Sequence, residues 1–296
     1  MDKFFKMDIT GKDYSNMVFE KIDDKIDREN LIKEAYPKAL EIIKANSFKE
    51  DDFKDLYGSA VEEDKKKFKE NEYREIDESV KLSEIFNAII LEEFKKKNWI
   101  SENASTKGTS KFDKYTTGIS NITEFNDKKG TSYMAMAIRA TYSPNLRDKL
   151  MKTKENIRAG ELSKIKYFNS EQNRGELKKI PSFIIGCSKE MLLEVTELWL
   201  QNKNKELSEH PIQFLIMDAI KEQIYNFRKE ALSYGYMELV KIYENAKNRI
   251  DQILKDKEDL REKLENPKKG DSLKFKEEND KVMNALKVEL KSVFGY

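Results

Sequence analysis

Apolar residues recur at spacings of three and four along much of the first third of the chain, and this is the period of an amphipathic α-helix. The pattern is clearest over residues 81–99, where it predicts a long helix with lysines at its C-terminal end, the end at which the helix dipole favours cations. Another helix is predicted from Asp27 onward, and Pro37 is expected to kink or split it. We therefore predict a mainly helical N-terminal region over residues 1–78.

In the middle of the chain the period changes to two, which is typical of β-strands. A helix that opens at Pro144, with Ser143 as its N-cap, separates the first strands from the later ones. Strands joined by such a helical crossover are expected to pair in parallel. The predicted strands lie near residues 121–125, 132–142, 163–168 and 182–187. We therefore predict an α/β (α+β) core over residues 79–236, with a central mixed sheet flanked by helices.

From Tyr236 the pattern is almost wholly helical again, with apolar residues close to a heptad spacing. A turn is expected at Asn266–Pro267, between helices over residues 237–265 and 272–293. The third predicted region, residues 237–296, is therefore a long, charged helical hairpin that is able to project from the core.

The composition narrows the class of protein further. Charged residues make up 38% of the chain, yet the net charge is only +1, so any affinity for nucleic acid must come from a local patch. No stretch is apolar enough to span a membrane, and the first residues lack the apolar run of a signal peptide. A single cysteine fits a reducing compartment. We expect a cytoplasmic protein that is not bound to a membrane.

Several common chemistries have no motif in this sequence. There is no Walker sequence and no GxGxxG, which argues against the usual nucleotide-binding enzymes. One cysteine and one histidine cannot build a structural zinc site. His210, which precedes Pro211, is expected to cap or pack at a helix start, and Cys187 is expected to be a buried thiol.

The order of helix, strands, helix and strand resembles the core of the restriction-endonuclease-like superfamily, also called PD-(D/E)XK. The resemblance is carried by SNITEF, MAMAIRATYS, the helix from Pro144 and ELSKIKYF, and it covers roughly residues 80–225. The stretches GELKKIPSFIIG and EHPIQFLIMDAI also look like uncharacterised bacterial proteins with this core. The resemblance implies a nuclease-like protein of nucleic-acid metabolism, with DNA or RNA as its partner.

In that superfamily, acidic residues of the second and third core strands, often with a lysine, hold a Mg²⁺ ion that activates water. In this sequence Arg139 stands where the resemblance places the third-strand acid, and Thr141 stands two residues further on, where a lysine is expected. Because an arginine repels Mg²⁺, the resemblance implies either a site that has moved or a relative with a degenerate active site.

If the site has moved, Asp113 and Glu124 are the acids that we expect to bind Mg²⁺ and act in catalysis, with Lys164 or Lys166 stabilising charge. If it has been lost, Arg139, Lys164 and Lys166 are expected to bind phosphate groups of nucleic acid instead. The alternative interpretation makes Glu124 a solvated strand residue, Asp113 a loop residue, and the basic residues the coating of an exposed face.

The sequence thus leaves open whether the protein is an enzyme. The leading hypothesis is a nuclease-like protein that is weakly active or inactive as a Mg²⁺-dependent phosphodiesterase. The alternative is a non-enzymatic interaction protein that binds a protein partner through its helical regions, with the C-terminal helices as the candidate surface. The two differ in whether the carboxylates of Asp113 and Glu124 converge on one ion.

Overall fold

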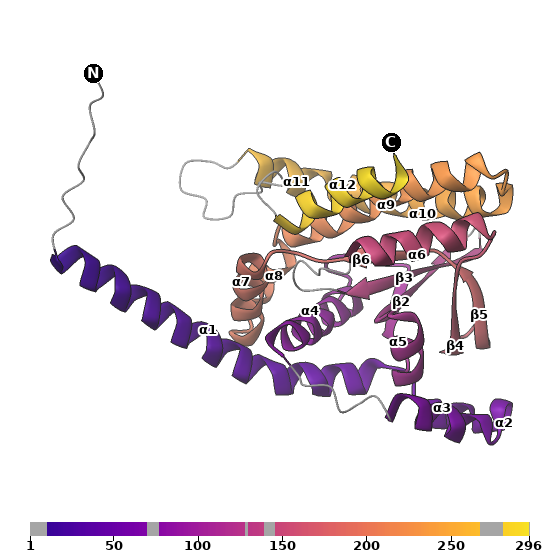
Figure 1. Ribbon diagram of the computed structural model, residues 1–296, viewed down its shortest axis with the longest axis horizontal. Helices are drawn as coiled ribbons and strands as arrows, with labels where there is room; N and C mark the ends of the chain where they lie inside the picture. Colours follow the sequence, from indigo (N-terminus) through magenta and orange to yellow (C-terminus); the bar gives the residue numbers. More distant parts are fainter. Residues whose placement is uncertain (1–10, 70–76, 128–129, 139–145, 267–280, 296) are drawn as a thin grey trace.

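The computed structural model of the protein describes residues 11–69, 77–127, 130–138, 146–266 and 281–295. Helices surround a small central sheet (Figure 1). The predicted α+β class, with a mixed sheet flanked by helices and with helices at the C-terminus, is confirmed.

The N-terminal region is helical, as predicted, but its first helix is not split at Pro37. This helix, α1 (Gly11–Asn46), continues through the proline. Burial of Ala35 and Ala39 on either side of Pro37 helps to hold the helix together, because α1 packs there against α4 (Glu78–Lys95) and α7 (Lys189–Leu200). Between α1 and α4 lie η1 (Glu50–Phe53), α2 (Lys54–Tyr57) and α3 (Ala60–Lys69).

The central sheet has four strands in the order β1-β2-β3-β6. Its first three strands form an antiparallel meander, and β6 pairs in parallel with β3. The connection from β3 to β6 contains α6 (Leu146–Arg158) and two further strands, so the expected parallel pairing holds for β3 and β6. The predicted start of this helix, at Ser143 and Pro144, lies outside the described residues. The strands are β1 (Ala104–Gly108), β2 (Asn121–Asp127), β3 (Gly130–Ile138) and β6 (Ser182–Ile185).

The prediction that residues 163–168 belong to the central sheet is wrong. They form β4 (Ser163–Asn169), which pairs with β5 (Arg174–Ile180) in a separate two-stranded antiparallel sheet. Both strands alternate buried and exposed residues and are joined by a short polar loop. Pairing between neighbours in the sequence closes a much smaller loop than pairing with the distant β3, which favours the hairpin.

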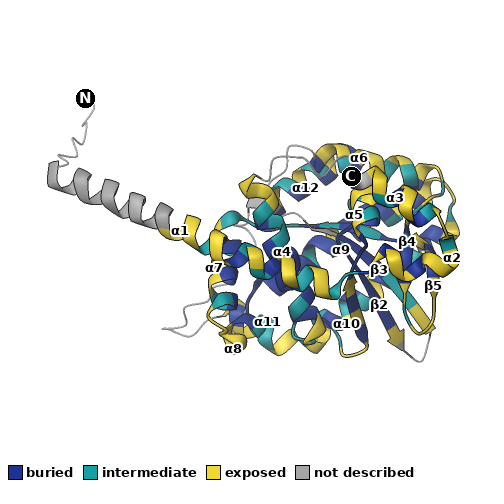
Figure 2. Cartoon of the chain, turned by 90° about the horizontal axis from the view of Figure 1, so that it is seen from below, coloured by how far each residue is buried: buried dark blue, intermediate teal, exposed yellow. Residues whose placement is uncertain are grey.

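The two faces of the central sheet pack against different elements, and Figure 2 shows that the buried residues gather between the helices and the sheet. One face packs against α4, α9 (Ile212–Ser233) and α10 (Met237–Asp256), and a single large apolar cluster fills this side. We call this cluster the main core; its large aromatic members include Phe86, Trp99, Phe183, Phe227 and Tyr243. The other side holds a smaller cluster, the second core, whose members include Phe53, Val61, Ile122, Ile165 and Tyr167.

The C-terminal helices belong to the main core. After α9, the chain turns at Gly235, whose φ of 75° suits glycine, and runs back as α10 against α9. The last helix, α12 (Lys281–Phe294), packs against α6 and also against α9, so α9 is the common neighbour of α10 and α12. These helices therefore pack on the sheet domain. The shorter helices nearby are α8 (Asn204–Ser208) and α11 (Glu258–Glu265).

The edge strand β6 is protected by a glutamine from α9. The side chain of Gln223 accepts a hydrogen bond from the backbone N–H of Ile184 at 2.8 Å and donates one to its C=O at 2.9 Å. This pair satisfies backbone groups that an edge strand otherwise leaves open. Within the described ranges, no helix is both long and apolar enough to cross a membrane.

Candidate functional site

Asp113 lies at the start of α5 (Lys111–Thr117) and joins this helix to β4. The helix begins at the N-cap Ser110, whose hydroxyl accepts a hydrogen bond from the Asp113 N–H at 3.0 Å. The Asp113 carboxylate accepts hydrogen bonds from the backbone N–H groups of Lys166 at 2.8 Å and Tyr167 at 3.0 Å, and from the Ser110 hydroxyl at 2.8 Å. Both of its oxygens are therefore engaged within the protein.

The Asp113 side chain is also almost completely buried, with 2% of the residue exposed. Burial raises the pKa of its carboxyl group, although the N–H groups of Lys166 and Tyr167 act in the opposite direction. In this setting Asp113 is a buried link between a helix and a strand. A metal ion bound here would have to replace hydrogen bonds that hold α5 to β4.

Lys166 forms an ion pair that the sequence analysis did not predict. Its ammonium group contacts the carboxylate of Asp64 on α3, which also accepts a hydrogen bond from the Tyr167 hydroxyl at 2.8 Å. The same ammonium group lies 5.0 to 5.5 Å from the ring centroids of Tyr57, Phe112 and Tyr167. Lys166 is thus held by one acid and three aromatic rings.

Asp64 is 3% exposed. Its pKa is lowered, because the hydrogen bonds from Lys166 and Tyr167 outweigh the opposing effect of burial. One sequence signal pointed to this residue. Asp64 stands three residues after the buried Val61 of α3, on the same helical face, and a charged residue on an apolar face needs a partner.

Glu124 lies on β2, directly opposite Tyr133 of β3. Its carboxylate accepts hydrogen bonds from the Ser170 hydroxyl at 3.1 Å and from the Tyr133 hydroxyl at 3.5 Å. Glu124 also lines a cavity of about 510 Å³, which we call the Glu124 pocket. The other polar residues of this pocket are Ser105, Lys107, Asn126, Asn169, Ser170 and Glu171. With 6% exposure, Glu124 is a buried residue and not a solvated one.

The two predicted metal ligands have separate partners. Asp113 bonds to the backbone of Lys166 and Tyr167, and Glu124 bonds to Ser170, three residues further along the chain. Three extended residues span about 10 Å, whereas ligands of one Mg²⁺ ion each lie about 2.1 Å from the metal. Among the described residues, no group of three or more His, Cys, Asp or Glu side chains is placed to hold a metal ion. A Mg²⁺ site at Asp113 and Glu124 therefore stays a prediction.

The predicted phosphate-binding surface is divided in the same way. Lys164 is exposed on β4, whereas Lys166 is engaged by Asp64. Arg139 lies outside the described residues. Of the two described lysines, Lys166 is therefore already paired with a buried acid, and the predicted joint surface of Lys164 with Arg139 stays a prediction.

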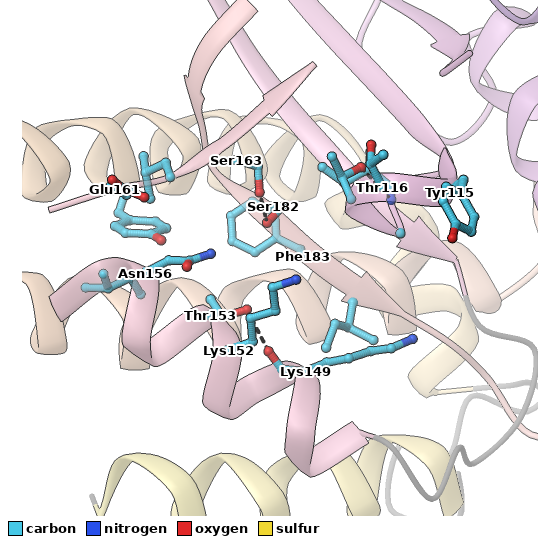
Figure 3. Close-up of a pocket in the computed structure, with 17 residues that line it drawn as sticks. Tyr115, Thr116, Lys149, Lys152, Thr153, Asn156, Glu161, Ser163, Ser182 and Phe183 are labelled. Carbon is cyan, nitrogen blue, oxygen red and sulfur yellow. Dashed lines mark hydrogen bonds between the residues drawn. The ribbon is translucent and has the colours of Figure 1, made fainter. Parts of the chain in front are cut away.

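A second polar pocket involves residues that the sequence analysis did not single out. It has a volume of about 290 Å³ and lies between α6, the C-terminal end of α5 and the start of β6; we call it the α6 pocket. From α6 it receives Lys149, Lys152, Thr153 and Asn156, which share one helical face. Figure 3 shows Lys152 and Asn156 pointing from α6 toward Ser182 and Phe183.

Hydroxyl groups complete the wall of the α6 pocket. The hydroxyl of Ser163 donates to that of Ser182 at 2.8 Å, so the Ser182 hydrogen remains available to a further acceptor (Figure 3). The pocket also contains Glu161, which opposes the positive charge of the lysines. The spacing of Lys149, Lys152, Thr153 and Asn156 was a signal present in the sequence, because it places two ammonium groups and two uncharged polar groups on one helical face.

His210 and Cys187 have structural environments, as expected. The Nδ1 atom of His210 accepts a hydrogen bond from the Ile212 N–H at 3.2 Å, in the first turn of α9, and the side chain is fully buried. Cys187 is buried in the main core. Both predictions are confirmed.

Comparisons of this chain with protein-family models, with curated proteins and with solved structures give no match. The restriction-endonuclease-like resemblance therefore remains an expectation drawn from the sequence.

Proposed function

We propose that this protein is a nuclease-like protein of nucleic-acid metabolism. It binds phosphate groups of DNA or RNA, and it hydrolyses the phosphodiester bonds weakly or not at all. The observation that carries the proposal is the α6 pocket, which is lined by Lys149 and Lys152 together with hydroxyl and amide side chains. Lysine, serine, threonine and asparagine side chains are common donors to nucleic-acid phosphates. A ligand at this position would be held mainly by charge and would confer little sequence specificity.

The arrangement of the central sheet supports the nuclease-like part of the proposal. A helix, α4, precedes three antiparallel strands, and α6 follows them, which agrees with the first part of the element order on which the resemblance rests. The strand that follows α6 is β4, which carries ELSKIKYF and lies in the separate sheet, so the parallel neighbour of β3 is β6 instead. Fold alone does not determine function, so the proposal depends on the pocket.

The state of the predicted acids supports weak or absent catalysis. Asp113 already accepts three hydrogen bonds, two of them from the backbone of β4. At about 4 Å and an effective dielectric of 20, one unit charge interacts with another by roughly 4 kcal/mol, so losing one carboxylate from a Mg²⁺ site costs much of its affinity. Without Asp113, Glu171 is the one other acid among the described residues that line the Glu124 pocket, and two carboxylates without a substrate phosphate make a poor Mg²⁺ site.

The proposal is tested by measuring fluorescence anisotropy of labelled single- and double-stranded DNA and RNA in EDTA, over a range of salt concentrations. We expect salt-sensitive binding, because neutralised phosphates release counterions. The Lys149→Ala/Lys152→Ala double variant should weaken binding to all sequences and lower the salt slope by about 2. Lys241→Ala, at an exposed lysine of α10, is the matched control.

Catalysis is tested on the same oligonucleotides in Mg²⁺ or Mn²⁺. Little or no cleavage is expected. Robust cleavage that Glu124→Ala abolishes would contradict the weak-catalysis part of the proposal and restore the metal site. Absence of salt-sensitive binding would contradict the binding part.

The alternative function is a protein partner bound through the C-terminal helices. One observation favours it, namely that Val288 of α12 and Met237 of α10 are 66% and 62% exposed. Single exposed apolar residues are common on proteins, so this observation is weaker than the α6 pocket. Pull-down with the Val288→Asp variant against the unmodified protein would test it.

A further inference from the structure

An open groove lies between the C-terminal end of α1 and α5. It has a volume of about 730 Å³, and we call it the α1–α5 groove. One wall comes from α1 and the segment after it, the other comes from α5, and Glu84 of α4 and Thr109 complete the lining. Tyr115 lines both this groove and the α6 pocket, so the two sites are neighbours.

The α1 wall presents an apolar stripe. Leu40 and Ile43 lie three residues apart on one helical face near the end of α1, and Ser47 follows directly after the helix ends. Phe48 extends the apolar wall, and Tyr115 faces it from α5. Leu40 is 43% exposed and Tyr115 is 46% exposed, so the groove is open to solvent along its rims.

Lysines stand on both sides of the groove. Lys44 and Lys49 belong to the α1 side, and Lys111 and Lys114 belong to α5. The two acidic residues of the lining have partners inside the protein, since Glu84 pairs with Lys114 at 2.5 Å and Glu50 accepts a hydrogen bond from the Phe112 N–H at 2.9 Å. The rims therefore carry an excess of positive charge around an apolar floor.

We propose that the α1–α5 groove binds an amphipathic helical segment of a partner protein, with acidic residues beside its apolar stripe. A groove between two helices, with an apolar stripe along one of them, fits the way in which amphipathic helices dock. The lysines on both rims select acidic flanks by charge complementarity. A small ligand would fit less well, because small-molecule sites enclose most of the ligand's surface and this groove is open.

This inference is independent of the nucleic-acid proposal, because it concerns a different ligand and, apart from Tyr115, different side chains. It also places a protein partner at the N-terminal side of the molecule and not at the C-terminal helices. The test avoids Tyr115, since a change there would disturb both sites.

The probe is a fluorescein-labelled peptide of about 18 residues, five helical turns, with leucines at helical spacings of three and four and glutamates beside them. The first control peptide has lysines in place of the glutamates. The second has the residues of the acidic peptide in scrambled order. We expect saturable binding of the acidic peptide only. Leu40→Gln should weaken it by about tenfold or more, and Lys44→Glu/Lys49→Glu should weaken it similarly while improving binding of the lysine peptide.

The matched control variants are Leu232→Gln, at an α9 leucine that is 49% exposed, and Lys241→Glu on α10. Circular dichroism checks that each variant is folded, and all variants should bind oligonucleotides like the unmodified protein. Equal binding of the acidic and scrambled peptides, or equal losses in groove and control variants, would overturn the proposal. Binding of decanoate, a small apolar anion, without binding of the peptide would also overturn it. So would self-association in sedimentation that Leu40→Gln abolishes, because the occupant would then be a second copy of this chain.

Discussion

The two faces of the central sheet are stabilised in different ways. The face toward α4, α9 and α10 buries one continuous apolar cluster that extends from α1 to α12. The other face carries the small second core, and next to it lie the buried charges Asp64, Asp113 and Glu124 with the ammonium group of Lys166. Apolar burial stabilises roughly in proportion to area, whereas buried charges require specific partners. The side of α4 and α9 also buries two acids, Glu93 and Glu230, but next to a much larger apolar cluster. The second face therefore depends more on its polar pairs, and it holds the predicted site residues Asp113, Glu124 and Lys166.

The largest expected effect comes from removing the last two main-core helices, α10 and α12. Truncation after Tyr236 deletes Tyr243, Ile250, Leu286 and Leu290, all of them buried in the main core. We expect the truncated chain to lose cooperative unfolding, measured by circular dichroism in urea. A truncated chain that still unfolds cooperatively would show that residues 237–296 are a separate appendage. The apolar clusters that stabilise the two faces would then differ less in size.

A single aromatic residue joins four elements of the main core. Phe227 of α9 stacks on Phe183 of β6 with ring centroids 6.2 Å apart, and its ring also contacts Tyr243 of α10 and Phe294 of α12. Phe227→Ala should lower the free energy of unfolding by about 3–5 kcal/mol, because it leaves a cavity in a packed core. Chemical denaturation measures this, and a loss below about 1 kcal/mol would mean that the core closes around the cavity.

On the second face, the most sensitive contact is expected to be the pair of Asp64 and Lys166. Asp64→Ala removes the partner of a half-buried ammonium group and of the Tyr167 hydroxyl, so we expect a loss of about 3 kcal/mol in the free energy of unfolding. The control is Asp51→Ala, which breaks an exposed pair with Lys65 and should have a far smaller effect. Equal effects of the two substitutions would show that burial does not distinguish these pairs.

The same contrast explains which features could be predicted from the sequence. The helix over residues 81–99 and the crossover from β3 to β6 follow from apolar periodicity, which reports burial directly. β1 is absent from the predicted strands because its residues, ASTKG, have little β-propensity, and its pairing with β2 is a tertiary effect.

The site was harder to predict than the fold. Asp113 and Glu124 were singled out as candidate metal ligands, which stays a prediction, and their partners, the backbone of β4 and Ser170, are distant in the sequence. Asp64 was missed for the same reason, since its partner Lys166 lies 102 residues away. Periodicity predicts the face of a helix or strand on which a residue lies, but it does not predict which distant residue contacts that face.

The smallest expected effect concerns the free energy of unfolding, to which Asp64 and Asp113 of the second face should contribute with opposite pH dependences. The folded-state pKa of Asp64 is lowered, so its contribution to stability is present above its unfolded pKa, about 4, and is lost as pH falls through the folded pKa. The folded-state pKa of Asp113 is raised by burial, so its contribution is fully present below about pH 4 and is lost as pH rises through the folded pKa.

Urea denaturation of Asp64→Asn and Asp113→Asn between about pH 3 and pH 6 should separate the two acids, because one titrating carboxyl group changes the free energy of unfolding by at most about 1.4 kcal/mol per pH unit. The stability difference between the unmodified protein and Asp64→Asn should shrink as the pH falls below about 4. The difference for Asp113→Asn should instead shrink as the pH rises above about 4. If both differences shrank toward low pH, the hydrogen bonds from β4 would outweigh the burial of Asp113, and this carboxylate would be held in its charged form. Such a result would also favour Asp113 as a ligand for Mg²⁺, because a carboxylate binds the ion in its ionised form.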